Sequence, residues 1–389
     1  MKKLATFLAV AVCFGAGLLL AAQAGKSAWK GTVATEDGVK VVKNPSEPLY
    51  GEFVFDLKED LRLGGDPERE ASYFPQRPSL TVDAAENLYV TDRRNNRVQM
   101  FDKAGVFVRT IGRQGQGPGE YLSAGYVHIE ADGNIWVEGG GPQWVVFSKD
   151  GLFLKNVVVG KFMLQKMLGP GGSFIGTTIP LAALGDPKHE LIRVESDGKI
   201  FRTIAEFRGE LSQAKRAISF HWYSNSITFA PVGPDAFVYG FTDEYKLYVA
   251  DFGGRTTLVM TQDEKPQSIS GREKDETRKN SSRAVMGSNN REEGIFFPDH
   301  RPYFRRLVAD DAGRIYVFRF KSILEKDAPN RVDVFSREGI YLYRMTWASL
   351  SLPDAIRSGS LYEVREDPET SEYLVSRQKI MNWEAMKAR

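Results

Sequence analysis

Two short stretches rich in histidine, aromatic and basic residues are the parts of this sequence best suited to binding a ligand. They are HWYSNS at 221–226 and HRPYFRR at 300–306. Guanidinium groups such as those of Arg301 and Arg306 can act as forked donors to an anionic or carbohydrate ligand. The same groups can instead serve the fold, since arginines often pair with carboxylates of neighbouring loops. The residues that we predict to line a ligand site are Arg94, Tyr121, His221, Trp222, His300, Arg301, Tyr303 and Arg306.

Metal binding and catalysis have less support in the residue pattern. His128, His221 and His300 could meet in a ring-shaped fold and hold a metal ion, but no H-E-x-x-H or other close ligand pair occurs. No G-x-S-x-G motif occurs either. We therefore predict no metal or other cofactor and assign no catalytic residue. Calcium or zinc in a central channel is the alternative, and a calcium site would need converging carboxylates such as Glu138, Asp243 and Glu244.

The elements that must position these side chains recur along the chain. Residues 82–92 (VDAAENLYVTD), 129–139 (IEADGNIWVEG) and 309–319 (ADDAGRIYVFR) each place a turn before a short apolar strand. Two further strands follow in each case, joined by a tight turn ending in glycine, which suits the positive φ of a hairpin. Each repeat thus has four strands, and the six repeats open at Asn87, Asn134, Ser173, Ala236, Arg314 and Glu372.

The sixth repeat stops one strand short, and the N-terminal region can supply the missing strand. Residues 53–74 resemble residues 105–122, with Leu63 aligned on Ile111. A strand from the start of the chain would complete the last sheet and leave no gap in the ring. We therefore predict an all-β fold, a six-bladed β-propeller of four-stranded antiparallel blades in which an N-terminal strand closes the last blade.

Residues 92–121 resemble an NHL repeat. A D-x-x-N-x-R run begins at Asp92, and an I-G-x-x-G-x-G-P-G-E connection begins at Ile111. The whole chain is similar to exported bacterial six-bladed propellers, and residues 296–317 resemble their penultimate blade. NHL domains generally bind proteins or RNA, and relatives of the same shape include enzymes with a metal in the central channel. The resemblance therefore implies the fold more firmly than the function.

The two faces of such a propeller differ in their loops. Turns between the first and second and between the third and fourth strands are short and share one face, here called the short-turn face. Connections between the second and third strands and between blades are long and share the other, here called the long-loop face. Because long loops carry function more often than tight turns, we predict the ligand site at the channel mouth on the long-loop face.

Two loop segments allow more specific predictions. The stretch 112–120 (GRQGQGPGE) lacks the Lys-Ser/Thr ending of a phosphate loop, so we expect its glycines to let the backbone pass closely between blades. Glu120 should then cap or pair locally. In the longest connection, Ser270 and Glu273 have the spacing of a helix-capping box. We expect an exposed helix there, with a disordered loop as the alternative.

The N-terminus and the composition indicate an exported protein. Lys2 and Lys3 precede an apolar stretch, 4–20, and the small residues of AQA at 22–24 suit cleavage of a signal peptide. An uncleaved membrane anchor is the alternative. The only cysteine, Cys13, lies in this segment, so the mature chain has no disulfide. Without the two lysines, basic and acidic residues balance at 50 each, which argues against binding nucleic acid or an anionic membrane.

These observations give a division of the chain and a function. We predict a signal peptide at 1–24, a flexible segment at 25–48 and a single propeller at 49–384, with an inserted loop or helix at 265–298 between blades four and five. The mature protein should be a periplasmic or secreted monomer that binds a protein, peptide or glycan through its long-loop face, with no nucleic-acid partner and no membrane attachment after cleavage. The alternative is a metal-assisted hydrolase or lyase with its site at the channel mouth.

Overall fold

The computed structural model of the 389-residue chain describes residues 29–66, 68–160, 163–178, 188–208, 218–219, 221–280, 285–286, 297–347 and 351–387. The predicted signal peptide and Cys13 lie outside the described residues, as do parts of the predicted insertion. Among the described helices, none is both long enough and apolar enough to cross a bilayer.

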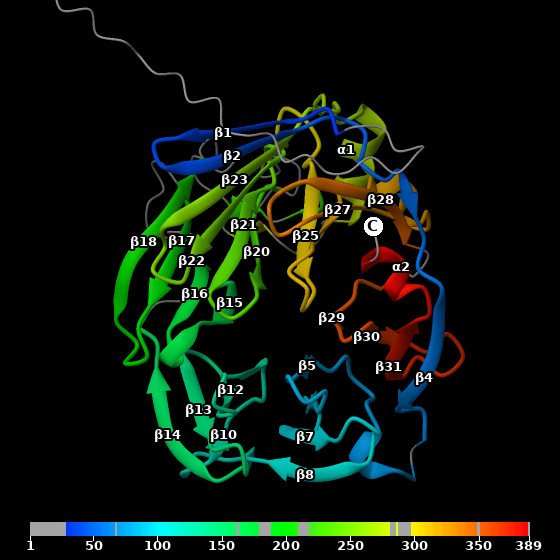
Figure 1. Cartoon of the computed structure of the whole chain (residues 1–389). Coiled ribbons are helices and arrows are strands. Elements are labelled where there is room, and N and C mark those ends of the chain that lie inside the picture. The colour runs from blue at the N-terminus through cyan, green and yellow to red at the C-terminus, as the bar shows by residue number, and fades with distance from the viewer. Residues whose placement is uncertain are drawn as a thin grey trace, which may run out of the picture.

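Six antiparallel sheets stand around a central axis, and each contributes its first strand to the inside of the ring (Figure 1). The strands of blades one to three, from inner to outer, are β5 (Leu80–Val82), β6 (Leu88–Asp92), β7 (Arg97–Phe101) and β8 (Phe107–Ile111); β11 (Val127–Ile129), β12 (Ile135–Glu138), β13 (Gln143–Phe147) and β14 (Phe153–Val158); and β15 (Gln165–Leu168), β16 (Phe174–Thr178), β17 (His189–Val194) and β18 (Ile200–Phe207). This arrangement confirms the predicted β-propeller.

The same order repeats in the second half of the ring. The strands of blades four to six are β20 (Ile227–Val232), β21 (Ala236–Phe241), β22 (Lys246–Asp251) and β23 (Thr256–Gln262); β25 (Phe304–Ala309), β26 (Ile315–Arg319), β27 (Asn330–Phe335) and β28 (Tyr341–Trp347); and β29 (Ala355–Arg357), β30 (Ser360–Glu366), β31 (Tyr373–Ile380) and β4 (Leu57–Leu63). Two short pairs lie outside the blades, β9 (Arg113–Gln114) with β10 (Glu120–Tyr121) and β19 (Ile218–Ser219) with β24 (Val285–Met286).

The N-terminal strand β4 closes the ring, as the repeat pattern predicted. It pairs antiparallel with β31, in a register that sets Leu63 opposite Val375 and Leu57 opposite Ile380. Leu61 and Leu63 are buried in the cluster that also holds Val375 and Val364. Because this strand comes from the other end of the chain, the first and last segments hold each other in place and no blade is left with an open gap.

The segment that we expected to be flexible, 25–48, instead carries a hairpin. β1 (Thr32–Glu36) pairs with β2 (Val39–Asn44), and β2 lies parallel to β23 on the outer edge of blade four. Val42 is fully buried in the core between blades four and five. The Asn44 side chain donates to the carbonyl of Gly339 and accepts from the amide of Tyr341 at 2.9 and 2.8 Å. These long-range contacts supply the burial that the local sequence does not reveal. A further short strand, β3 (Glu52–Phe53), lies parallel to β28.

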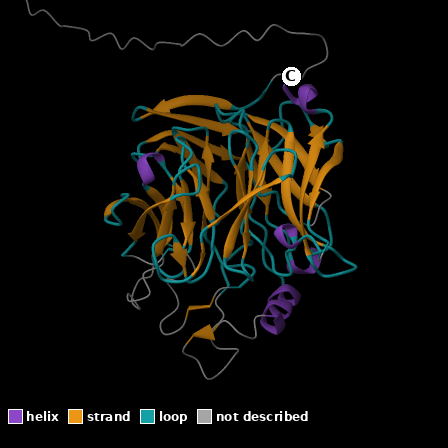
Figure 2. Ribbon diagram, turned by 90° about the horizontal axis from the view of Figure 1, so that it is seen from below, coloured by secondary structure: helices purple, strands orange, loops and turns teal. Residues whose placement is uncertain are grey.

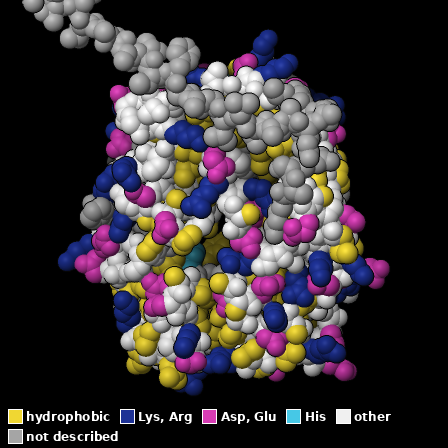
Figure 3. All heavy atoms as spheres, viewed as in Figure 1, with side chains coloured by type: hydrophobic (Ala, Val, Ile, Leu, Met, Phe, Trp, Pro, Cys, Tyr) yellow, Lys and Arg dark blue, Asp and Glu magenta, His cyan; other side chains and the backbone are white. Residues whose placement is uncertain are grey.

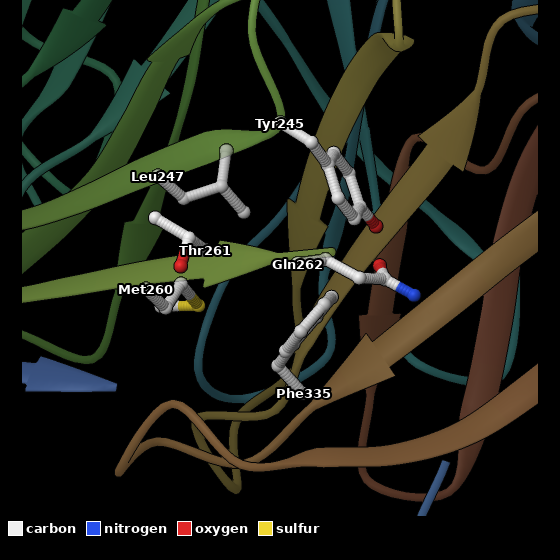
Figure 4. Close-up of a pocket in the computed structure, with 6 residues that line it drawn as sticks. All are labelled: Tyr245, Leu247, Met260, Thr261, Gln262 and Phe335. Carbon is white, nitrogen blue, oxygen red and sulfur yellow. The ribbon is translucent and has the colours of Figure 1, made fainter. Parts of the chain in front are cut away.

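The apolar core lies between the blades rather than within one layer. Because each blade has a neighbour on both faces, its middle strands are buried on both sides and read as near-continuous apolar runs, such as β13 and β26. Figure 4 shows the seam between blades four and five, where Tyr245, Leu247 and Met260 face Phe335. The gap in this seam has no room for a water molecule, so it is a packing contact and not a ligand pocket.

The helix α1 (Gly271–Asn280) and the C-terminal helix α2 (Trp383–Lys387) lie at opposite ends of the propeller axis (Figure 2). α1 belongs to the connection between β23 and β25 and therefore marks the long-loop face. α2 follows β31 and marks the short-turn face. Acidic and basic side chains are interspersed in the view of Figure 3, in keeping with the balanced charge of the chain.

Candidate functional site

The motif that resembles an NHL repeat has a structural role. Asp92 is buried at the end of β6, and its carboxylate accepts from Asn95 Nδ2 at 2.8 Å and from Arg97 Nε at 2.9 Å. Arg97 also contacts Glu70 Oε1 at 3.0 Å, which ties this loop to the N-terminal segment. Arg94, a predicted ligand residue, is exposed on the same loop.

The glycine-rich connection after β8 also serves packing. Tyr121 is fully buried between blades one and two, and its hydroxyl donates to the carbonyl of Ile111 at 2.7 Å. A Cβ at Gly112, which has a φ of 65°, would lie only 2.4 Å from Cε1 of this ring. Tyr121 is thus a core residue, and its prediction as a ligand residue was wrong because the chain turns the ring inward. Glu120 accepts from Gly117 N at 2.9 Å, which confirms its expected local role.

The predicted helix is present and begins with the predicted capping box. The amide of Ser270 donates to Glu273 Oε2 at 2.9 Å, and the Ser270 hydroxyl accepts from the Glu273 amide at 3.3 Å. The same glutamate is fully buried and faces the propeller. The helix therefore docks on the long-loop face through its first turn.

A buried hydrogen-bond network holds this helix. Glu273 Oε1 accepts from Tyr223 Oη and Ser322 Oγ at 2.6 Å each, and from Arg301 Nη2 at 2.9 Å. Burial acts to raise the pKa of Glu273, but the hydrogen bonds from Ser322, Tyr223 and Arg301 outweigh it and lower that pKa to about 2. Arg301 also donates to Gln267 Oε1. Arg301 thus serves the fold with most of its side chain, and its role as a ligand residue stays a prediction.

The stretch 221–226 places one aromatic side chain at the surface. His221 packs against Phe297, with ring centroids 4.8 Å apart, and its Nδ1 accepts from the amide of Tyr223. Trp222 keeps 42% of its surface exposed, while its Nε1 donates to the carbonyl of Lys321 at 2.7 Å. This bond fixes the indole in one orientation without covering it. Trp222, one of the predicted ligand residues, therefore presents part of its ring to solvent, and its role stays a prediction.

The histidine of the second stretch faces a neighbouring loop. His300 Nε2 lies 3.8 Å from Asp243 Oδ1, and the same carboxylate oxygen accepts from Asn225 Nδ2 at 2.8 Å. Tyr303 packs edge-on against His300 and stacks on Tyr245, at 5.5 and 6.1 Å between centroids. His300 and Tyr303 are half-buried, so they support the rim and present only part of their surface.

The remaining predicted residue, Arg306, reaches the start of blade six. Its Nη2 lies 4.0 Å from Asp354 Oδ1, the residue immediately before β29. Burial lowers the pKa of Arg306, and the positive charge of Arg77 lowers it further against the opposing effect of Asp354. Burial also raises the pKa of Asp354. These side chains come from three successive blades and precede or begin the inner strands.

Several residues around this point were not predicted as site residues. Tyr126, just before β11, is 57% exposed, and the Arg93 guanidinium lies over its ring at 5.7 Å. On the next blade, Lys166 Nζ pairs with Glu138 Oε1 at 2.8 Å. Arg305 was also missed, although Arg306, its neighbour in β25, is among the predicted site residues. The position of each residue just before or within an inner strand was the available signal.

His300 and Asp243, two of the residues considered for a metal, lie 3.8 Å apart, and no third candidate of the described residues completes a metal site with them. His128 packs on Trp144 at 5.3 Å, and burial lowers the pKa of this histidine to about 4. His189 packs on Phe241, and burial has the same effect on its pKa. Within the described part of the chain, no three His, Asp or Glu side chains cluster in a way that could hold a metal ion. These residues therefore do not form a binding site for calcium or zinc in the channel.

Comparison with known proteins supports the fold. Residues 75–156, which span the first two blades, match the model of the DUF5128 family of six-bladed β-propellers. No curated protein matches the sequence. A solved structure of a Bacteroides fragilis protein, for which export has been suggested, is similar at a TM-score of 0.52 and 11% identity, covering 87% of this chain and 99% of its own.

Two further solved structures resemble the chain less closely. One is a DUF4221 protein from Bacteroides vulgatus, at a TM-score of 0.47 and 10% identity over 83% of this chain and 98% of its own. The other is virginiamycin B lyase from Staphylococcus aureus, at 0.41 and 13% identity over 83% of this chain and 99% of its own. The ring of sheets and the family match agree with each other: the chain is a six-bladed β-propeller.

Proposed function

We propose that the protein is an exported binding platform, periplasmic or secreted, whose long-loop face holds a partner protein or peptide. The observation that carries this proposal is the pair of exposed aromatic side chains, Trp222 and Tyr126, at 42% and 57% exposure. Trp222 is held by its hydrogen bond to Lys321, and Arg93 lies over the Tyr126 ring. Rigid, exposed Trp and Tyr side chains are typical anchors of protein interfaces because they lose little entropy on binding.

A protein partner fits this face better than a glycan. Leu122 and Leu324 are also exposed on long-loop connections, at 56% and 40%. Aliphatic side chains gain from burial against other apolar groups, whereas sugars need polar donors and flat aromatic rings. The similarity of residues 92–121 to an NHL repeat agrees with this proposal, because protein binding is one activity of NHL domains. RNA, the other NHL ligand type, is disfavoured by the balanced charge of the chain.

The test is a binding screen of the purified mature protein against arrays of 15-residue peptides and of oligosaccharides. Peptides that bind should then be titrated by calorimetry against Trp222→Ala and Tyr126→Ala. Each substitution should weaken binding by at least tenfold, because each removes an aromatic side chain that the bound peptide would bury. The expected control is Leu152→Ala, which truncates a similarly exposed residue in the turn between β13 and β14 on the short-turn face.

The outcome is decided by the pattern across the three variants. The proposed binding face would be wrong if both aromatic variants kept full peptide affinity, or if Leu152→Ala lost as much affinity as they did. Binding to oligosaccharides alone would replace the protein partner with a glycan. Circular dichroism of each variant separates loss of the contact from loss of the fold.

A further inference from the structure

Arg305 and Arg306 at the start of β25 and Arg77 just before β5 bring positive charge to the long-loop face. We infer that Arg305 and Arg306, with Arg77 beside them, receive a side-chain carboxylate from an acidic segment of the partner protein. This inference deepens the proposed function and depends on it, since it names the chemistry of the partner at the same face.

A break in strand pairing presents the two arginines. Phe304 pairs with Arg319 and Arg306 with Phe318, so Arg305 is an extra residue in β25. Such a bulge changes the direction of the side chains around it and is common beside binding sites. Arg305 Nη2 donates to Asn330 Oδ1 at 2.6 Å, while its Nε is buried and lacks a hydrogen-bond partner.

The charges around these arginines do not balance. Asp354 is the carboxylate near Arg306, at 4.0 Å, and no carboxylate of the described residues lies within 4.0 Å of Arg305. Burial lowers the pKa of both Arg305 and Arg306. The charge of Arg306 lowers the pKa of Arg305 further, and the charge of Arg77 adds to the lowering at Arg306, against the opposing effect of Asp354. Arg306 and Arg77 thus share one aspartate, Asp354, whose own charge burial disfavours, and Arg305 stands beside Arg306. An added carboxylate would relieve this repulsion and could accept two parallel hydrogen bonds from one guanidinium.

The arginines connect the two aromatic anchors. Trp222 donates to the carbonyl of Lys321. Burial lowers the pKa of Lys321, and the charge of Arg305 lowers it further. At the other end, Tyr126 contributes to the electrostatic environment of Arg306. The surface thus runs from an exposed indole through a basic stretch to an exposed phenol. A segment with an acidic residue between apolar residues is complementary to this order.

Several other charged groups of the rim already have partners. Lys166 pairs with Glu138, and Asp243 accepts from Asn225 and faces His300. Lys321 itself donates to the carbonyls of Lys326 and Ala328, so its ammonium group is occupied by the loop between β26 and β27. An acidic peptide therefore has its counterpart at Arg305, Arg306 and Arg77, for which the described residues supply the carboxylate of Asp354.

The experiment uses a peptide array in which each 15-residue peptide is paired with a version carrying Asn and Gln for every Asp and Glu. The mature protein should bind acidic peptides at least tenfold more tightly than their neutral partners. Arg305→Gln and Arg306→Gln should each remove most of that difference, and Arg306→Lys should restore part of it. Affinity for acidic peptides should also fall as salt rises from 50 to 500 mM, because dissolved ions screen the attraction between the arginines and the peptide carboxylates.

The matched control is Arg337→Gln. Arg337 is an exposed arginine of the same blade, in the tight turn between β27 and β28 on the short-turn face. It should leave peptide affinity unchanged. Equal binding of acidic and neutral peptides, or full affinity in Arg305→Gln and Arg306→Gln, overturns the inference, as does exclusive binding of acidic oligosaccharides. If Trp222→Ala abolishes peptide binding while the arginine variants do not, the proposed function stands and this inference alone fails.

Discussion

At the scale of single residues, the same residue types serve the fold and the surface, and hydrogen-bond partners decide between the two roles. Arg301 is bound by Glu273 and Gln267, whereas Arg306, five residues later, has a single carboxylate at 4.0 Å. Sequence reasoning identified both because they lie in one basic–aromatic stretch. It could not tell their roles apart, because the partner of Arg301, Glu273, lies on helix α1, which docks from another part of the chain.

The buried carboxylate of Glu273 gives a test at this scale. Glu273→Gln should lower the free energy of unfolding by about 3 kcal/mol, since it leaves Arg301 without its buried partner. The folded-state pKa of Glu273, about 2, lies below its ordinary value of 4.5, so the carboxylate stabilises the protein above pH 4.5. That contribution is lost as pH falls through the range 4.5 to 2.

Urea unfolding of both proteins at several pH values measures this effect. The stability difference between wild type and Glu273→Gln should be constant from pH 5 to 7 and should shrink below pH 4.5. Glu276→Gln, at a partly exposed position of the same helix, is the control and should show little change at any pH. A difference between wild type and Glu273→Gln that grows toward acid pH would contradict the assigned role.

At the scale of elements, what could be predicted depended on repetition. The strand β4 was found because its sequence aligns with the end of the first repeat, and the structure pairs it with β31 as expected. The hairpin of β1 and β2 was missed because it belongs to no repeat and its burial comes from blades four and five. Tyr126 and Arg305 were missed for a related reason: the exposure of a loop residue and the position of a bulge arise from packing and not from local sequence.

The hairpin offers a test at the scale of elements. Val42→Asp should destabilise the protein on the order of 3 kcal/mol, because it places a charge in the core between blades four and five. Val33→Asp, on the exposed strand β1, should change stability by less than about 0.5 kcal/mol. Thermal unfolding of both variants measures the difference. Equal, small effects would mean that the hairpin does not dock on β23 in solution.

At the scale of the whole molecule, closure of the ring fixes which loops meet. Because β4 completes blade six, the connections before every inner strand converge on one mouth, and Arg77, Tyr126, Arg306 and Asp354 come together from four blades. The short-turn face has its own constraints, with glycine-containing turns that pack on neighbouring blades. The division between a structural face and a binding face is therefore a property of the closed ring.

Hydrogen exchange with and without a peptide from the array tests this division most directly. The account predicts that bound peptide slows amide exchange in residues 121–126, 221–223 and 303–306 on the long-loop face. Exchange in the tight turns at 148–152 and 336–339 should stay unchanged. Protection confined to those turns, or to the outer strands β8 and β14, would contradict the assignment of the long-loop face as the binding surface.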